Sequence, residues 1–302
     1  METVRRGLEP ILVGNAFARV EQRRPDLRFP LPNRFGERLS GRRVEALDRR
    51  AKYLLARLDD GEVLVMHLGM TGRFSIDPAN GEPNAPGHFA HQIGDTPKHE
   101  HVVFHLGNGT AVRYTDTRRF GLMDLVPADK LESHALFKGL GIEPLSKAFT
   151  ADWLAQKLKG KATSIKAALV DQRLIAGLGN IYACEALFKA RVSPLRLARS
   201  LATRSGKPTP KTAGLVTAIK AVLEDAIKAG GSSLRDYKRT DGSLGDFQHS
   251  FKVYGREGKK CQTVGCSSTV RRSGSSECRA DWIIGLLISV SSLGHNARFS
   301  GE

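Results

Sequence analysis

The first part of the chain has the apolar runs and turn residues that are typical of β-strands. Residues 62–68 are apolar at nearly every position, as expected of a strand that is buried on both faces. Two further apolar runs, 102–106 and 111–114, flank the turn Gly107-Asn108-Gly109, which predicts a hairpin. Residues 1–128 are therefore expected to form a β-rich domain.

From about residue 150 the spacing of apolar positions becomes helical. Apolar side chains recur at helical intervals over 215–227, and Gly230-Gly231 is expected to end that helix. A short helix is also predicted from Glu2 to about Leu12. Residues 77–98 contain four prolines and three glycines, which predicts a long surface loop. The pattern thus predicts an α+β protein with a β-rich domain, a helical domain and a small cysteine-bearing tail.

The chain is strongly basic. Its 302 residues, enough for two domains, carry 47 Lys and Arg against 31 Asp and Glu, a net charge of +16. Eight basic and three acidic residues lie between positions 34 and 57. Such an excess favours a polyanionic partner, with nucleic acid as the first candidate. Ribosome association and a basic surface without function are the alternatives.

No segment indicates export or a membrane. The N-terminus lacks the apolar core of a signal peptide, and the longest apolar run, 282–290, is far below the ~18 residues of a spanning helix. A cytoplasmic protein is expected. In a reducing compartment, the clustering of Cys261, Cys266 and Cys278 within 18 positions favours metal ligation over disulfides.

Two segments far apart in the sequence contain side chains suited to opening a base pair. Residues 67–72 place Met70 between glycines, and residues 116–121 place two arginines, including Arg118, beside Phe120. Arginine hydrogen-bonds phosphates and base edges, whereas Met and Phe can enter a base stack. An enzyme that acts on a base inside a duplex must take it out of the stack, and something has to fill the gap. The alternatives are a strand edge for the arginines and a core position for Met70.

A glycine-rich turn that contains Gly177 and Gly179 joins two expected helices, one over 165–171 and one over 180–188. Asn180 opens the second helix, where it is expected to serve as the N-cap. Glycines let backbone amides approach an anion at a helix N-terminus, so this corner could bind a DNA phosphate. By local physics alone, an ordinary helix-turn-helix corner is favoured.

Titratable side chains supply two further candidates. Lys52 lies beside Arg49 and Arg50, which could lower its pKa and suit it to proton transfer near neutral pH. A solvated lysine on a basic face is the alternative. Five of the nine histidines lie between positions 88 and 105, where phosphate contacts are favoured over a metal site.

Several of these segments occur together in a known family. The Met70 hairpin, the Arg-Arg-Phe run, an Ala-Lys-Tyr-Leu strand, the Gly-Leu-Gly-Asn-Ile-Tyr corner and Val253-Tyr254-Gly255-Arg256 are all present. Over about residues 2–272 the chain resembles bacterial formamidopyrimidine-DNA glycosylase, an 8-oxoguanine repair enzyme. The resemblance implies a β-sandwich flanked by helices over 1–128, a helix-two-turn-helix domain over 146–240 and a zinc-finger hairpin over 245–302.

The resemblance also implies a reaction and site residues. The expected protein is a monomer that binds damaged double-stranded DNA, removes oxidised purines and cleaves the strand as an AP lyase through a Schiff base. Lys52 matches the lysine that assists β-elimination. The matched DNA-binding side chains are His67, Met70, His99, Arg118, Phe120, Lys161 and Asn180, of which Met70, Arg118 and Phe120 fill the space left by the flipped base. Residues 230–247 resemble the segment that covers the damaged base.

The chain departs from the family pattern at its start. The family begins Met-Pro-Glu-Leu-Pro-Glu-Val-Glu-Thr, whereas this chain begins Met1-Glu2-Thr3. The absent block carries the family's nucleophile, the secondary amine of the N-terminal proline, and its catalytic glutamate. An α-amine titrates near ~8 and is a usable nucleophile at neutral pH, whereas an ordinary lysine near ~10.4 is not. Met1 aligns with the family's valine, so a GTG valine codon read as a start is the expected explanation.

The cysteine-bearing tail also departs from the family. The resemblance implies one Zn²⁺, and Cys261 and Cys266 suit half of such a site. The second pair should follow a hairpin whose arginine reaches into DNA. Here Cys278 comes early and has no cysteine partner, which leaves His295 as the nearby candidate for a fourth ligand. The zinc finger is therefore expected to be incomplete.

Two other functions fit parts of the sequence. Without the proline block, the protein would bind damaged DNA but would not catalyse excision. A ribosome-associated RNA-binding protein would explain the charge. RNA binders usually present aromatic stacking platforms, however, and aromatic residues are only 7% of this chain.

Overall fold

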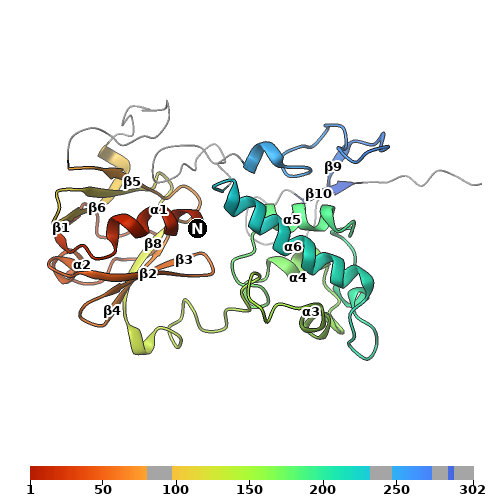
Figure 1. Ribbon diagram of the computed structural model, residues 1–302, viewed down its shortest axis with the longest axis horizontal. Coiled ribbons are helices and arrows are strands. Elements are labelled where there is room, and N and C mark those ends of the chain that lie inside the picture. The colour runs from red at the N-terminus through yellow and green to blue at the C-terminus, as the bar shows by residue number, and fades with distance from the viewer. Residues whose placement is uncertain (80–96, 232–246, 274–284, 289–302) are drawn as a thin grey trace, which may run out of the picture. The chain divides into compact units, whose positions relative to one another are not determined.

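The computed structural model describes residues 1–79, 97–231, 247–273 and 285–288. The chain divides into two compact units, and each is described here by itself (Figure 1). The first unit contains Met1–Ser146, Asp171–Leu178 and Leu223–Ser250, and the second contains Lys147–Val170, Gly179–Val222 and Phe251–Glu302. Most of the loop predicted over 77–98, and most of the segment 230–247, lies outside the described residues.

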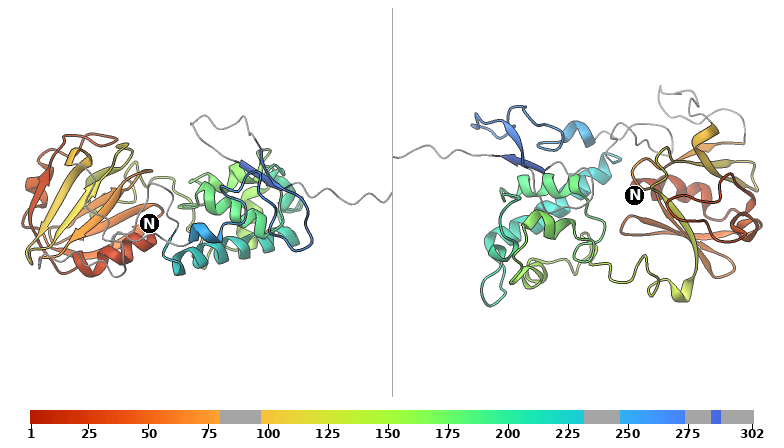
Figure 2. Two further views of the ribbon diagram at one scale, coloured as in Figure 1. Left: turned by 90° about the horizontal axis from the view of Figure 1, so that it is seen from above. Right: turned by 180° about the vertical axis from the view of Figure 1, so that it is seen from behind.

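Two four-stranded antiparallel sheets form the first unit. One has the strand order β1-β6-β7-β5 and the other β2-β3-β4-β8. The strands are β1 (Phe17–Gln22), β2 (Val44–Arg50), β3 (Tyr53–Leu58), β4 (Glu62–His67), β5 (Arg73–Asp77), β6 (Glu100–Leu106), β7 (Ala111–Thr115) and β8 (Leu122–Pro127). The hairpin predicted around Asn108 is β6–β7, and the expected β-sandwich is confirmed (Figures 1 and 2).

Helices complete the core of the sandwich. In α1 (Glu2–Leu12), the helix predicted at the N-terminus, Val4, Leu8 and Leu12 share one face because they are spaced by four residues. This face is buried in the same core as side chains from both sheets, and Figure 2 shows α1 along one side of the sandwich. A shorter helix, α2 (Phe35–Leu39), buries its first and last side chains there. The first unit also contains three short 3-10 helices, η1 (Pro97–His99), η2 (Ala128–Lys130) and η4 (Phe247–Ser250).

Strand β4 is apolar on both faces because each face has its own covering layer. Leu64 and Met66 point into the core between the sheets. Val63 and Val65 point the other way, into a smaller cluster that includes Phe137. Alternate residues of a strand face opposite sides, so two covering layers require a continuous apolar run. The prediction of a strand buried on both faces is confirmed.

Most of the basic side chains between positions 34 and 57 are held in ion pairs. The pairs are Arg34–Glu37, Arg38–Glu62, Arg42–Asp60, Arg49–Glu2, Arg50–Glu143 and Arg57–Asp48. Several of the acidic partners are distant in sequence, so local charge counting could not reveal them. Most of the positive charge in this segment is therefore paired with acidic side chains of the same protein.

The second unit is mainly helical, and its described residues also form two short strands. Its elements are α3 (Ala151–Leu158), α4 (Ile165–Val170), α5 (Asn180–Lys189), η3 (Ala198–Leu201), the larger part of α6 (Pro210–Lys228), β9 (Val270–Ser273) and β10 (Gly285–Ile288). Thr150 caps α3, because its side chain accepts a hydrogen bond from the Trp153 backbone N–H (3.2 Å). The change to helical structure near residue 150 is thus confirmed. Strands β9 and β10 pair antiparallel.

The end of α6 follows the prediction from its glycines. The Gly231 N–H bonds the Ala226 carbonyl (2.7 Å) and the Gly230 N–H bonds the Ile227 carbonyl (3.0 Å). The two glycines have positive φ, +74° at Gly230 and +93° at Gly231, which ends the helix. In the described part of the chain, no helix combines the length and apolar character that crossing a bilayer requires.

Candidate nucleic-acid interface

Three of the predicted side chains come together on the first unit, and we call Met70, Arg118 and Phe120 the wedge. The Arg118 guanidinium lies 4.5 Å from the centre of the Phe120 ring, and its Nη1 donates to Met70 Sδ (3.6 Å). Met70 is 59% exposed and Phe120 43% exposed, although both are large and apolar. Apolar side chains grouped at the surface beside a cation are a suitable contact for an opened base stack.

Glycine makes the close approach of the two wedge loops possible. Gly69 has a φ of +62°, and a Cβ at this position would lie 2.4 Å from the Phe120 carbonyl carbon. A Cβ at Gly121 would lie 1.8 Å from the Tyr114 hydroxyl. Any side chain at either position would separate the loops, so the glycines that flank Met70 and Phe120 in the sequence are structurally required here.

A buried carboxylate joins the two wedge loops. Asp116 is fully buried and accepts hydrogen bonds from the Gly121 N–H (2.8 Å), the Arg118 N–H (3.3 Å) and the Tyr114 hydroxyl (3.2 Å). It also accepts one from the Thr71 hydroxyl on the other loop. Burial, reinforced by the Asp116 charge, raises the pKa of Tyr114, so the phenol stays a donor. Sequence analysis assigned no role to Asp116, because its partners are identified only in the folded chain.

Lys52 lies in the tight turn that joins β2 and β3. Ala51, the residue before it, has a φ of +53°, which is unfavourable for a residue with a Cβ. The Glu143 carboxylate holds this turn, because it accepts from the Ala51 N–H (2.6 Å) and from Arg49 (2.9 Å). On another side, the bare Cα of Gly177 allows close approach to Ala51. Sequence analysis did not identify Glu143 or this packing.

Burial, rather than charge from the neighbouring arginines, lowers the pKa of Lys52. The expectation that Arg49 and Arg50 would have this effect was wrong. Both guanidinium groups form ion pairs with Glu143, and Arg49 also pairs with Glu2. Their positive charge is therefore largely compensated locally, whereas partial removal from water disfavours the ammonium form directly.

His67 lies in the same half-buried group of titratable groups as Lys52. Burial, then the charges of Lys52, Arg28 and the Met1 α-amine, lower the pKa of His67 to about 4. The Met1 α-amine has its own pKa lowered to about 6, first by burial and then by Arg49. The fold thus gathers a lysine, a histidine and an α-amine whose pKa values all lie below their usual range.

The predicted His99 lies next to the wedge loops, while a neighbouring histidine is structural. The His99 carbonyl accepts from the Asp116 N–H (3.0 Å). His101 is only 2% exposed, and its Nε2 lies 2.7 Å from the Asp116 carbonyl oxygen. His88 and His91 lie outside the described residues. Among the residues that are described, no three His, Cys, Asp or Glu side chains are arranged to hold a metal ion.

Lys161 and Asn180 belong to the second unit. Lys161 is exposed just after α3. Asn180 is the first residue of α5, and the N-cap is Gly179. The prediction that Asn180 would be the N-cap was therefore wrong by one residue. The position still lies at the positive end of a helix dipole, where an anion is stabilised.

A buried carboxylate also organises the second unit. Glu185 is 5% exposed and accepts from three successive backbone N–H groups, those of Lys252 (2.9 Å), Val253 (3.0 Å) and Tyr254 (2.8 Å). The segment that leads to the cysteines is thereby fixed to α5. Glu185 was not predicted from the sequence. The available signal was a single acidic residue within an otherwise apolar stretch of helix.

Two of the three predicted zinc ligands are described and fit half of a site. Burial raises the pKa of Cys261, but hydrogen bonds from Thr263 and Cys266 outweigh this effect and lower it. The Thr263 N–H donates to the sulfur (3.4 Å), an arrangement that suits a metal-bound thiolate. Cys278 and His295 lie outside the described residues. Cys261 and Cys266 would hold zinc, which when bound supplies a structural crosslink.

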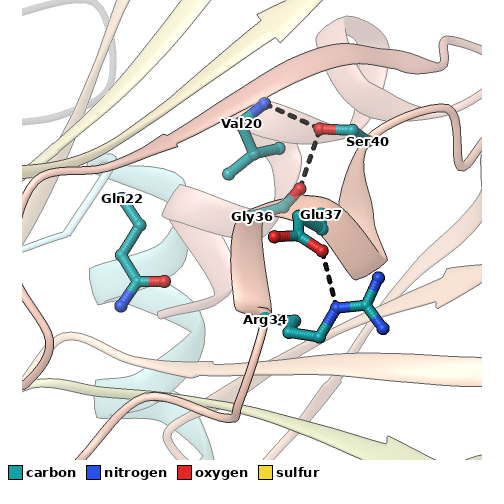
Figure 3. Close-up of a pocket in the computed structure, with 6 residues that line it drawn as sticks. All are labelled: Val20, Gln22, Arg34, Gly36, Glu37 and Ser40. Atoms are coloured by element: carbon teal, nitrogen blue, oxygen red, sulfur yellow. Dashed lines mark hydrogen bonds and ion pairs between the residues drawn. The ribbon is translucent and has the colours of Figure 1, made fainter.

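A surface hollow of about 340 Å³ lies elsewhere on the first unit, between β1 and α2 (Figure 3). Its polar groups bond mainly to one another. The Ser40 hydroxyl donates to the Gly36 carbonyl (2.8 Å) and accepts from the Val20 N–H (3.2 Å), and Arg34 pairs with Glu37 (2.6 Å). None of the predicted site residues lines this hollow, so it is separate from the candidate interface.

Comparison with known families identifies two matching regions. The N-terminal domain of formamidopyrimidine-DNA glycosylase matches residues 1–123, and the H2TH domain of formamidopyrimidine-DNA glycosylase matches residues 140–238. The formamidopyrimidine-DNA glycosylase of Azorhizobium caulinodans is 56% identical over 272 residues, which cover 90% of this chain and 92% of that protein. The corresponding protein of Methylobacterium nodulans is 55% identical over 273 residues, with the same coverage.

Solved structures give the same result. The MutM (Fpg) protein of Thermus thermophilus is 39% identical and superposes with a TM-score of 0.74, over 91% of this chain and 92% of that one. Lactococcus lactis Fpg in complex with abasic-site DNA is 29% identical, with a TM-score of 0.77 over 95% of each chain. The wild-type Lactococcus lactis protein has also been solved with DNA containing an oxidised pyrimidine, with a TM-score of 0.76 at 29% identity over 95% of each chain.

Proposed function

The chain belongs to the formamidopyrimidine-DNA glycosylase family of base-excision DNA glycosylases, and we propose that it removes oxidised purines from duplex DNA and then cleaves the strand. The substrates are 8-oxoguanine and formamidopyrimidines. The observation that carries this proposal is the exposed wedge on the same unit as the half-buried group of Lys52 and His67. A wedge fills the stack when a base leaves it, and amines with lowered pKa values suit attack on the sugar.

Each part of the site has a proposed task. The wedge, Met70, Arg118 and Phe120, occupies the space left by the flipped nucleotide. His67, His99, Lys161 and Asn180 contact the DNA backbone. An amine attacks C1′ of the damaged nucleotide and displaces the base; the resulting Schiff base permits β-elimination of the strand, and Lys52 assists the proton transfers. Burial favours the deprotonated form of Lys52, which this task requires.

We further propose that the protein acts as a cytoplasmic monomer on damaged double-stranded DNA. Cys261 and Cys266 have the surroundings of zinc ligands, and Cys278 is the third candidate. Because this set contains three cysteines, zinc is expected to be held less tightly than by four ligands. The zinc-bearing segment contributes to DNA binding rather than to the excision step.

Borohydride trapping tests the reaction. Duplexes with 8-oxoguanine, with an abasic site and without damage are incubated with the 302-residue protein and with a variant in which Met1 is replaced by Met-Pro-Glu-Leu-Pro-Glu-Val. We expect covalent trapping and base excision on the damaged duplexes with the variant, since it supplies the proline amine, and the 302-residue protein is the comparison. Lys52→Met in the variant should reduce strand cleavage by about 100-fold or more.

Three outcomes would overturn or revise this proposal. If the proline-containing variant neither traps nor excises on any damaged duplex, the proposed reaction is wrong. Efficient excision by the 302-residue protein would instead identify another nucleophile, with Lys52 as the first candidate. A single-stranded RNA competitor that displaces the duplex at equal concentration would favour RNA binding.

A further inference from the structure

His67 has been assigned above to the DNA backbone. We propose that it meets a phosphate oxygen there as a neutral imidazole that donates from Nε2, and that Tyr53 and Phe137 hold the ring in this orientation. This inference rests on the proposed function for its ligand, a phosphate of damaged duplex DNA. The inference specifies the protonation state and tautomer of His67. It also gives positioning roles to Tyr53 and Phe137, which take no part in the proposed reaction steps.

The register of the sheet places Tyr53 directly against His67. The two residues are paired across β3 and β4, at the end of each strand that is adjacent to the wedge loop. Their rings lie 5.0 Å apart between centres, with a tilt of 48°. Side chains that are paired across two strands lie on the same face of the sheet. Tyr53 therefore restricts the directions in which the imidazole can turn.

The next turn determines which nitrogen carries the proton. The Gly69 N–H donates to His67 Nδ1 at 3.0 Å. A nitrogen that accepts a hydrogen bond is unprotonated, so in the neutral ring the hydrogen is on Nε2. The donor nitrogen is then directed away from the turn that holds Nδ1.

The same glycine connects this hydrogen bond to the wedge. Gly69 has positive φ, and its Cα packs against the Phe120 carbonyl, where a Cβ would lie 2.4 Å away. The position of the Gly69 N–H is therefore set by the contact between the two wedge loops. The geometry that presents Phe120 also orients His67, so both are ready before DNA arrives.

Tyr53 is itself held by a second aromatic contact. The Phe137 ring lies 5.1 Å from the Tyr53 ring at 63°, an edge-to-face arrangement. Phe137 is 8% exposed and belongs to the smaller apolar cluster on the outer face of β4. The imidazole is thus connected through two rings to a packed part of the fold.

The charges that face His67 oppose its protonation. Lys52 approaches from the β2–β3 turn, Arg28 from the 23–31 loop, and the Met1 α-amine from the start of α1. Tyr53, from β3, has its own pKa raised by burial and therefore brings no charge. Together with burial, the three cations lower the pKa of His67 to about 4. As long as the His67 imidazole stays neutral, the strength of its hydrogen bond to a phosphate should not change with pH.

Nuclear magnetic resonance tests the protonation state without DNA. The protein is labelled with nitrogen-15 at histidine, and long-range proton–nitrogen spectra are recorded from pH 5.5 to 8, with His67→Asn used to assign the signals. We expect the neutral Nε2–H tautomer at every pH. An imidazolium signal at pH 6, or the Nδ1–H tautomer, would overturn the proposal. This measurement stands even if the protein proves not to bind damaged DNA.

Binding to a duplex with a tetrahydrofuran abasic-site analogue tests the contact. His67→Ala should weaken binding about tenfold. The loss should be equal at pH 5.5 and 7.5, and the salt dependence should be unchanged, because a neutral donor displaces no counterion. The cation variant Lys161→Ala, at an exposed lysine assigned to the DNA backbone, should lower the salt slope by roughly 0.9. A loss for His67→Ala that is several-fold larger at pH 5.5 would identify a cationic contact instead. If wild-type protein shows no preference for the damaged duplex, the proposed function fails and the spectra alone decide the state of His67.

A double-mutant cycle tests the positioning role. Tyr53→Leu should weaken binding nearly as much as His67→Ala, and the double variant should be within about twofold of His67→Ala alone. Tyr53→Phe keeps the ring and should bind like wild type. If Tyr53→Leu does not fold, Phe137→Leu applies the same test from the second ring. Additive losses, or a wild-type histidine spectrum in a folded Tyr53→Leu protein, would show that Tyr53 does not position His67.

Discussion

The wedge and the cysteine turn, residues 261–268, are both short surface segments, but they are held in different ways. Beneath the wedge, the buried Asp116 carboxylate accepts four hydrogen bonds, and two glycines allow the loops to touch. The cysteine turn is closed by the Cys261 N–H to Ser268 carbonyl bond (2.9 Å) and a few contacts to sulfur. None of residues 261–269 is buried, and Val264 is fully exposed.

This difference shows where each segment obtains its order. The wedge is organised by groups that the chain itself supplies, so it exists before DNA binds. The cysteine turn buries none of its side chains, and a segment without a core needs a metal or a crosslink to become rigid. The wedge should therefore respond to substitutions beneath it, whereas the cysteine turn should respond to metal.

The largest expected effect comes from removing the carboxylate beneath the wedge. Asp116→Ala leaves several buried donors without an acceptor, so the free energy of unfolding should fall by about 3 kcal/mol. Urea denaturation measures the change. Asp129→Ala, an exposed position in η2, is the control and should stay within about 0.5 kcal/mol of wild type. If Asp116→Ala costs less than about 1 kcal/mol, the wedge is not held by this carboxylate.

The second-largest expected effect concerns zinc, which should be needed by the cysteine turn but not by the wedge. We expect less than one zinc per chain by atomic absorption when the protein is purified without added metal, because three cysteines do not close a tetrahedral site. With the proline block restored, strand cleavage should then be impaired more than base excision. Gln262→Ala, at an exposed position in the same turn, is the control and should leave the zinc content unchanged. One tightly bound zinc together with normal strand cleavage would show that the tail is an intact variant.

A smaller effect is expected at the wedge surface. Arg118→Ala should weaken binding to an abasic-site duplex by on the order of tenfold, and binding to undamaged duplex by much less, because the side chain acts in the opened stack. Fluorescence anisotropy at fixed salt measures both. Arg34→Ala is the control, because it removes an exposed arginine that is paired with Glu37. It should not change the preference for the abasic-site duplex over the undamaged one. An equal loss of affinity for the two duplexes would show that Arg118 does not act in the opened base stack.

The smallest effect is a shift along the pH axis. Lys52 must lose its proton to accept one, so strand cleavage should rise as the pH rises through its pKa. Burial lowers that pKa, so the rise should be centred below the ~10.4 of an ordinary lysine. Rates from pH 6 to 10 with the proline-containing variant test this, and Lys52→Met should abolish the rise. A rise centred near ~10.4 would mean that Lys52 titrates as a solvated lysine.

Much of the candidate site could be predicted because its members lie in short, distinctive segments. Met70 between glycines and Arg118 beside Phe120 are residue types that suit a wedge, and the other family segments of the chain support this prediction. The errors have a common origin. The cause of the lowered Lys52 pKa depends on burial and on Glu143, and the N-cap of α5 depends on one residue of backbone geometry. Neither property is encoded in the few residues on either side.

The sequence by itself determined the elements whose signals are local: the helix at 2–12, the β6–β7 hairpin, the doubly buried β4 and the glycine end of α6. Their apolar spacing and turn residues act over a few positions, so they can be recognised without the fold. Only the tertiary structure decided the partners of the basic segment at 34–57, the donors around Asp116 and the orientation of His67. These depend on groups brought together from distant parts of the chain, and only the packed core places them within hydrogen-bond distance.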